Sequence, residues 1–139
     1  MVGYAADIAP EEAWEMLTKD LTSVLVDVRS IAEWSYVGVP DLNELSKQPL
    51  LIEWQLFPEN TVNPQFIDKI TERIPDLDTP IIFICRSGAR SASAAGALSN
   101  VGYSRCYNLA GGFEGVHDSN NHRGLVSGWK ALGLPWMQS

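Results

Sequence analysis

Short apolar segments that resemble β-strands alternate with helix-like segments along this chain. The strand-like segments are residues 4–6, 21–28, 50–56, 80–84 and 106–109. The helix-like segments are residues 8–20, a turn over 29–34, and residues 63–74, 87–100 and 124–132. Such alternation is typical of α/β domains built on a mostly parallel sheet. We therefore expect an α/β fold of this kind.

Two of the expected helices carry informative residues. Asn63 followed by Pro64 is a strong helix start, with asparagine as the N-cap and proline at the first helical position. In the last helix, we expect Leu125, Trp129 and Leu132 to face the core.

Composition limits the possible partners and location. The 139 residues, 45% of them hydrophobic, fit a single domain over residues 1–139. A net charge of -7 does not favour nucleic acid, and no apolar run approaches the roughly 20 residues that cross a bilayer. Two cysteines do not make a disulfide framework, and no signal peptide is visible over residues 1–7. We therefore expect a reduced, cytoplasmic setting, with neither nucleic acid nor membrane as a partner.

Cys85 is the most informative residue for function. It follows the apolar run 81–84 and precedes a loop of small residues and two arginines. Burial disfavours a thiolate, but cations, backbone N–H groups and a helix N-terminus all stabilise an anion. We therefore expect the N–H groups of residues 86–91 to surround an exposed, ionised and nucleophilic sulfur. The residues expected to bind an anionic substrate are Arg86, Ser87, Gly88, Ala89, Arg90 and Ser91.

Supporting residues are expected near Cys85. Asp27 and Arg29 follow another strand, and ligands of open α/β sheets bind beyond the carboxyl ends of the strands. We expect these two residues to form an ion pair that fixes the loops rather than to act in catalysis. Arg90 is also expected to join an ion pair, whereas Arg86 fits donor binding and a solvated loop position equally well.

Other polar and sulfur-containing residues leave alternatives open. Ser87 and Ser91 could donate their hydroxyls to the sulfur or cap the following helix. Cys106 is expected to be inert core, although a position close to Cys85 would allow a disulfide between them. His117 and His122 lack the neighbours of a metal site, so we expect them at the surface and predict no metal.

The loop from Cys85 to Ser91 resembles the active-site loop of rhodanese-like sulfurtransferases. Other segments resemble further family motifs in the same order: 25–29 with 33–34, then 37–40, 108–113 and 133–136. The resemblance covers nearly the whole chain. It implies a rhodanese-like fold, with a central, mostly parallel five-stranded sheet and helices on both faces.

The resemblance also implies a two-step reaction that needs no cofactor. The Cys85 thiolate attacks the outer sulfur of a small anionic donor such as thiosulfate, releases sulfite and becomes a persulfide. A thiophilic acceptor then takes the sulfur: cyanide in an assay, and a thiol or a protein in the cell.

Two other functions of the same fold remain as alternatives. Phosphatases and arsenate reductases place an arginine after five residues from the cysteine, but position 91 is Ser and the nearest arginine is Arg90. A non-catalytic binding or regulatory module is less favoured because Cys85 is present. The chain departs from the family pattern at 36–40 and in an insertion-like stretch at 41–49, which affects one wall of the pocket.

Overall fold

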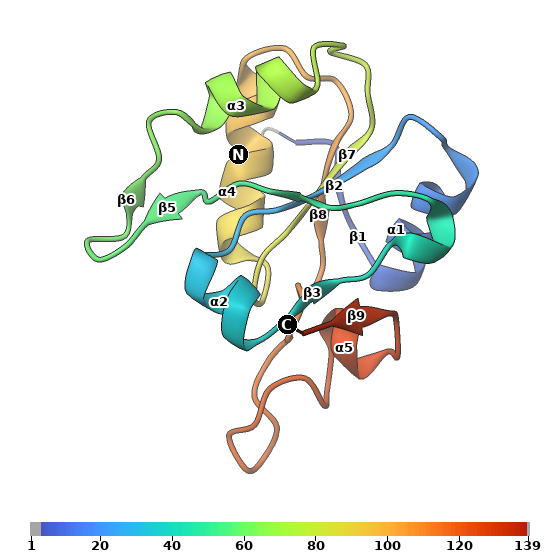
Figure 1. Ribbon diagram of the computed structural model, residues 1–139, viewed down its shortest axis with the longest axis vertical. Coiled ribbons are helices and arrows are strands. Elements are labelled where there is room, and N and C mark those ends of the chain that lie inside the picture. The colour runs from blue at the N-terminus through green and yellow to red at the C-terminus, as the bar shows by residue number, and fades with distance from the viewer. Residues whose placement is uncertain (1–3, 139) are drawn as a thin grey trace.

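The computed structural model describes residues 4–138, which form a five-stranded sheet with helices on both faces (Figure 1). The elements are β1 (Ala6–Ile8), α1 (Pro10–Lys19), β2 (Val24–Asp27), α2 (Ile31–Tyr36), β3 (Val39–Pro40), the 3-10 helix η1 (Asn43–Leu45), β4 (Leu50–Leu51), β5 (Gln55–Leu56), β6 (Thr61–Val62), α3 (Phe66–Arg73), β7 (Ile81–Ile84), α4 (Ala89–Asn100), β8 (Cys106–Leu109), α5 (Gly128–Ala131) and β9 (Trp136–Met137). The central sheet has the order β1-β8-β7-β2-β4, and all its neighbouring strands are parallel. The predicted α/β class is confirmed.

The sheet separates two apolar clusters, one on each face. Because side chains alternate along a strand, Phe83 packs toward α3 and α4, whereas Ile82 and Ile84 pack toward α1 and α5. All residues of β7 are buried, as expected for a parallel strand covered on both faces. In α4, the small side chains of Ala94 and Ala95 are buried and let the helix approach the sheet closely. Helices on both faces confirm the layering that the family resemblance implies.

The register of the strands brings their ends together. Asp27 pairs with Ile84, and Phe83 pairs with Asn108. Cys85, which follows β7 directly, therefore lies beside the ends of β2 and β8. We call this side of the sheet, where β1, β8, β7 and β2 end, the carboxyl edge, and the side where they begin the amino edge.

Two strand predictions need correction. The first strand is β1 at Ala6–Ile8 rather than residues 4–6, because pairing with β8 begins at Ala6. The strand predicted over 50–56 is divided into β4 and β5. The chain follows β2 as far as Trp54, whose N–H donates to Val28, and then leaves the sheet to form a hairpin with β6.

Two helix predictions also need correction. The helix expected from Asn63 begins at Phe66, because the Asn63 side chain accepts the N–H of Gln65 in a preceding turn. The last helix is confined to α5, and Leu125 and Leu132 are 67% and 47% exposed instead of buried. The N–H of Gly124 donates to the backbone oxygen of Glu114, and this hydrogen bond holds the chain before α5 in a loop.

The insertion-like stretch 41–49 packs toward the amino edge. Its Lys47 ammonium donates to the backbone oxygens of Asp20 and Ser23 at 2.8 and 2.9 Å, just before β2 begins. Among the helices of residues 4–138, none is long and apolar enough to cross a membrane.

Candidate active site

The Cys85 sulfur lies beneath its own loop at the carboxyl edge. The Gly88 N–H donates to Sγ at 3.1 Å, and the Ser91 hydroxyl lies 3.2 Å from Sγ. Gly88 has a φ of 121°, a conformation that glycine adopts without strain and that turns the loop into α4. Fewer donors surround the sulfur than predicted. In the described part of the chain, one backbone N–H and one hydroxyl contact it.

Cys85 is only 1% exposed, so the prediction of an exposed sulfur is wrong. The reason is the turn after β8, which packs against the loop: the Phe113 N–H donates to the Cys85 oxygen at 2.7 Å. A Cβ on Gly112 would lie 2.5 Å from that oxygen, so only glycine permits this approach. The turn thus packs on the backbone of Cys85, and Ser91 of α4 contacts its sulfur; local sequence reveals neither contact.

A fully buried ion pair supports the loops beside Cys85. Arg29 donates to both carboxylate oxygens of Asp27, with its Nη2 at 2.7 Å and its Nε at 2.9 Å. Arg29 also donates to the Gly38 oxygen at 2.6 Å, and its guanidinium lies 4.3 Å from the centre of the Phe113 ring. The predicted ion pair is confirmed. It ties the end of β2 to the turn before β3 and to the turn that covers Cys85.

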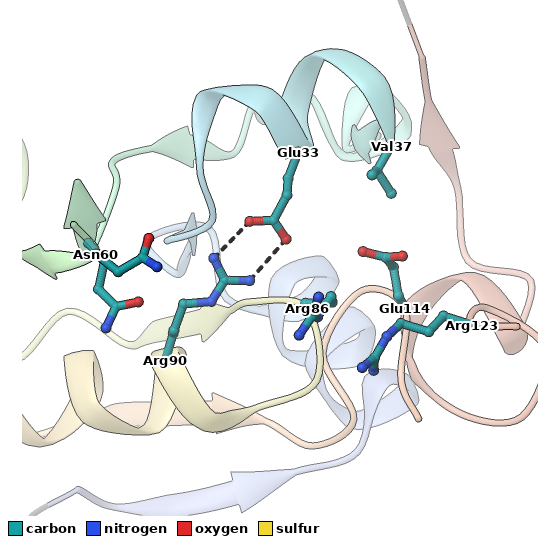
Figure 2. Close-up of a pocket in the computed structure, with 8 residues that line it drawn as sticks. Glu33, Val37, Asn60, Arg86, Arg90, Glu114 and Arg123 are labelled. Carbon is teal, nitrogen blue, oxygen red and sulfur yellow. Dashed lines mark hydrogen bonds and ion pairs between the residues drawn. The ribbon is translucent and has the colours of Figure 1, made fainter. Parts of the chain in front are cut away.

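A second ion pair joins α2 to α4. Arg90 donates to Glu33 through both terminal nitrogens, at 2.7 and 2.9 Å, as Figure 2 shows. Burial opposes ionisation of Glu33, but hydrogen bonds and charge from Arg90, together with hydrogen bonds from Ser30, outweigh it and lower its pKa to about 2. Arg90 thus forms the predicted ion pair, and Glu33 compensates its charge.

A polar cavity of about 450 Å³ opens above the loop (Figure 2). Its lining residues are Glu33, Val37, Gln55, Asn60, Arg86, Arg90, Glu114 and Arg123. Arg86 is exposed, and within residues 4–138 neither Arg86, Arg123 nor Glu114 joins an ion pair. Cys85 lies below the cavity and does not line it in the described structure. The site therefore combines a covered sulfur with an open, arginine-bearing cavity.

Comparison with known proteins identifies the family. A family model described as the rhodanese-like domain matches residues 9–119. This chain belongs to the rhodanese-like domain family. The crystal structure of Rv0390 from M. tuberculosis matches with a TM-score of 0.90 and 47% identity, covering 98% of this chain and 99% of that one.

Two curated relatives of this rhodanese-like domain bear on its function. The uncharacterized RP600 homolog of Rickettsia rickettsii is 40% identical over 94% of this chain and 95% of its own length. The thiosulfate sulfurtransferase GlpE of Actinobacillus succinogenes is 30% identical over 93% of this chain and 87% of its own length.

The remaining predictions in this rhodanese-like domain have mixed outcomes. The N-cap of α4 is Gly88, so Ser87 does not cap the helix, and Ala89 is an exposed first residue of α4. Ser91 contacts the sulfur instead of capping the helix. The expected surface positions of the two histidines at 117 and 122 are confirmed, since both are exposed.

Cys106 has a different environment from Cys85. It pairs with Ile81, at the opposite end of β7, about 13 Å along the strand from Cys85. Burial raises the pKa of the Cys106 thiol. The expected core role is confirmed, and a disulfide with Cys85 is excluded by this separation.

Several residues of the site were missed by sequence reasoning. Glu114 and Arg123 come from the segment after β8, and Asn60 comes from the hairpin of β5 and β6. These polar residues lie in irregular segments, where no periodic pattern shows which side chains will meet. Asn108, by contrast, lies in the segment 108–113 that resembles a family motif, so the sequence did indicate that it belongs near the loop.

Proposed function

We propose that this rhodanese-like domain is a sulfurtransferase that carries sulfur on Cys85 as a persulfide. The observation that carries the proposal is the Gly88 N–H directed at Sγ, at the carboxyl edge and beneath an arginine-bearing cavity. Backbone N–H groups and cations stabilise a thiolate, which is the nucleophilic form of cysteine.

The reaction divides into two balanced displacements. In the first, the Cys85 thiolate attacks the outer sulfur of thiosulfate, the S–S bond of thiosulfate breaks, and sulfite leaves with the bonding electrons. In the second, an acceptor such as cyanide attacks the outer sulfur of the persulfide, forms thiocyanate and restores the thiolate. Neither step requires an external oxidant or a cofactor.

The cavity suits a small anionic donor. Arg86 and Arg123 carry positive charge there without an ion-pair partner in the described residues, whereas Glu33 neutralises Arg90. A chain with a net charge of -7 thus presents cations where thiosulfate would enter. Because Cys85 is buried, the donor reaches its sulfur only after the groups packed around it move apart.

The relatives and the loop support sulfur transfer over phosphate chemistry. GlpE of Actinobacillus succinogenes is named for thiosulfate sulfurtransfer and is 30% identical to this chain. A phosphatase loop requires an arginine at position 91, where this chain has Ser91, with its hydroxyl 3.2 Å from the sulfur. Both cysteines are free, which suits a reduced compartment such as the cytoplasm and a thiol or protein acceptor.

Intact-mass measurement tests the proposal. After incubation with thiosulfate, the protein should gain the mass of one sulfur atom, and cyanide should remove it. Cys85→Ser should abolish the gain, whereas Cys106→Ser, the matched control, should retain it. A folded protein that gains no mass would contradict sulfur transfer and favour a binding module. Hydrolysis of an aryl phosphate that is lost in Cys85→Ser would overturn the proposal in favour of a phosphatase.

A further inference from the structure

A series of hydrogen-bond contacts leads from the buried Cys85 sulfur to an exposed aspartate on β1. The Ser91 hydroxyl lies 3.2 Å from Cys85 Sγ and donates to Asn108 Oδ1 at 2.5 Å. Asn108 Nδ2 donates to Asp7 at 3.0 Å, and Tyr4 donates to the same Asp7 oxygen at 2.7 Å. Ser91 is fully buried and Asn108 is 6% exposed, whereas Asp7 is exposed.

The register of the sheet builds this series of contacts. Asp7 pairs with Asn108 across β1 and β8, and Asn108 pairs with Phe83 across β8 and β7. Paired residues of parallel strands lie on the same face, and α4 covers that face with Ser91 in its first turn. The contact between Asp7 and Asn108 thus depends on strand pairing, although 101 residues separate them in sequence.

Asp7 determines which end of the Asn108 amide faces Ser91. A carboxylate only accepts hydrogen bonds, so the amide nitrogen must face Asp7 and the amide oxygen must face Ser91. Reversing the amide would place two acceptors against each other. Tyr4 holds Asp7 from the other side, and its hydrogen bond to Asp7 raises the pKa of Tyr4, which keeps the hydroxyl a donor.

The Ser91 hydroxyl has one hydrogen and three neighbouring acceptor positions. They are Asn108 Oδ1 at 2.5 Å, Cys85 Sγ at 3.2 Å and the Gly88 oxygen at 3.2 Å. While that hydrogen is donated to Asn108, Ser91 presents a lone pair to the sulfur. A lone pair accepts the S–H of a thiol but repels a thiolate.

We propose that Asp7 and Asn108 are positioning residues that direct the Ser91 hydrogen away from Cys85 and thereby retain the proton on the resting thiol. The inference rests on Cys85 being the nucleophile of the proposed function. Because the Ser91 hydrogen stays on Asn108, the protonation of the Cys85 sulfur is coupled through Ser91 and Asn108 to Asp7 on a neighbouring strand.

The pH profile of Cys85 alkylation by iodoacetamide, followed by mass spectrometry, tests this coupling. Asn108→Ala removes the competing acceptor, so alkylation near neutral pH should accelerate roughly tenfold. Ser91→Ala should not slow the reaction, and Asn108→Ala should add nothing in a Ser91→Ala background. Slower alkylation of Ser91→Ala would overturn the inference, because it would show that Ser91 already donates to the thiolate. An unchanged profile for Asn108→Ala would also overturn it.

The other charges that influence Cys85 remain in all these variants. They are Arg90 on α4, Glu33 on α2, Arg86 in the loop, and the ion pair of Asp27 and Arg29 at the end of β2. Differences between the variants therefore report the Ser91 and Asn108 contacts rather than a change in neighbouring charge.

An exposed position provides a second test that does not risk the core. Asp7→Asn lets the Asn108 amide reverse, so alkylation should accelerate at both 0.1 and 1 M salt. Glu15→Gln, the matched control, removes the same charge from an exposed position of α1 and should leave the rate unchanged. An acceleration that disappears at about 1 M salt, where the Debye length is about 3 Å, would contradict the inference and indicate a long-range charge effect.

Alkylation does not involve sulfur transfer, so the two proposals fail separately. A protein that gains no sulfur from thiosulfate but shows this alkylation pattern would lose the proposed function and keep the coupling. A protein that gains sulfur from thiosulfate but lacks this alkylation pattern would keep the proposed function and refute the coupling alone.

Discussion

The two edges of the sheet hold similar residues in different ways. Each edge has one cysteine and an aspartate–arginine contact. At the carboxyl edge, Asp27 and Arg29 are fully buried with their charged groups 2.7 Å apart. At the amino edge, Asp20 and Arg105 are 4.0 Å apart, with side chains 32% and 48% exposed.

The two cysteines also differ in the surroundings of their sulfur atoms. Both are buried, yet Cys85 has a hydrogen-bond donor at its sulfur, whereas burial raises the pKa of Cys106. Burial disfavours the thiolate of Cys106, and the proposed function assigns the chemistry to the cysteine that has a donor beyond the strand end. Substitutions at the carboxyl edge, compared with counterparts at the amino edge, test this contrast.

The largest difference is expected between the two thiols. Cys85→Ala should reduce thiocyanate production from thiosulfate and cyanide to the uncatalysed background, because the other cysteine lies about 13 Å away along the sheet. Cys106→Ala should remain within about twofold of the parent, because its sulfur makes only core contacts. Steady-state thiocyanate assays measure both, and equal losses would remove the distinction between the edges.

The ion pairs should differ in their contribution to stability. Asp27→Asn leaves Arg29 buried without its counter-charge, so the free energy of unfolding should fall by about 3–5 kcal/mol. Asp20→Asn, at the exposed pair, should lower it by less than about 1 kcal/mol. Urea unfolding measures both values, and comparable losses would contradict the contrast.

Glu33 should make the carboxyl edge sensitive to acid. The pKa of Glu33 in the folded protein is about 2, below the ordinary 4.5. Its contribution to the free energy of unfolding is therefore present above pH 4.5 and is lost as pH falls through about 2. Partial exposure limits this contribution to the order of 2 kcal/mol. Urea unfolding of Glu33→Gln and the parent between pH 5 and pH 2 should show a stability difference that shrinks with acid. A constant difference would mean that the Arg90 contact does not depend on the charge of Glu33.

The smallest effect concerns donor binding. Arg86→Ala should raise the thiosulfate concentration for half-maximal rate several-fold, with a smaller change in the maximal rate, because its cation lines the cavity and has no ion-pair partner within residues 4–138. Arg105→Ala removes an arginine from the amino edge and should leave that concentration unchanged. If both variants behave alike, the effect is one of net charge rather than of position.

Much of the fold was predictable because its signals are local. The buried run of β7 and the small residues of α4 follow from their own composition, and the loop between them identified Cys85. The division of the strand predicted over 50–56 was not predictable, because apolar residues recur as far as Leu56, with only single polar residues between them, while the pairing with β2 ends before the hairpin.

Residue patterns were sufficient to predict the α/β order, the loop that carries Cys85 and the family which that loop resembles. Tertiary structure alone decided that Cys85 is covered, that Arg90 meets Glu33 from 57 residues away, and that Arg123 enters the cavity. The two groups of features differ in the sequence separation of the residues that determine them. Residue patterns report the preferences of near neighbours, whereas these contacts depend on strand register and on turns that bring distant segments together.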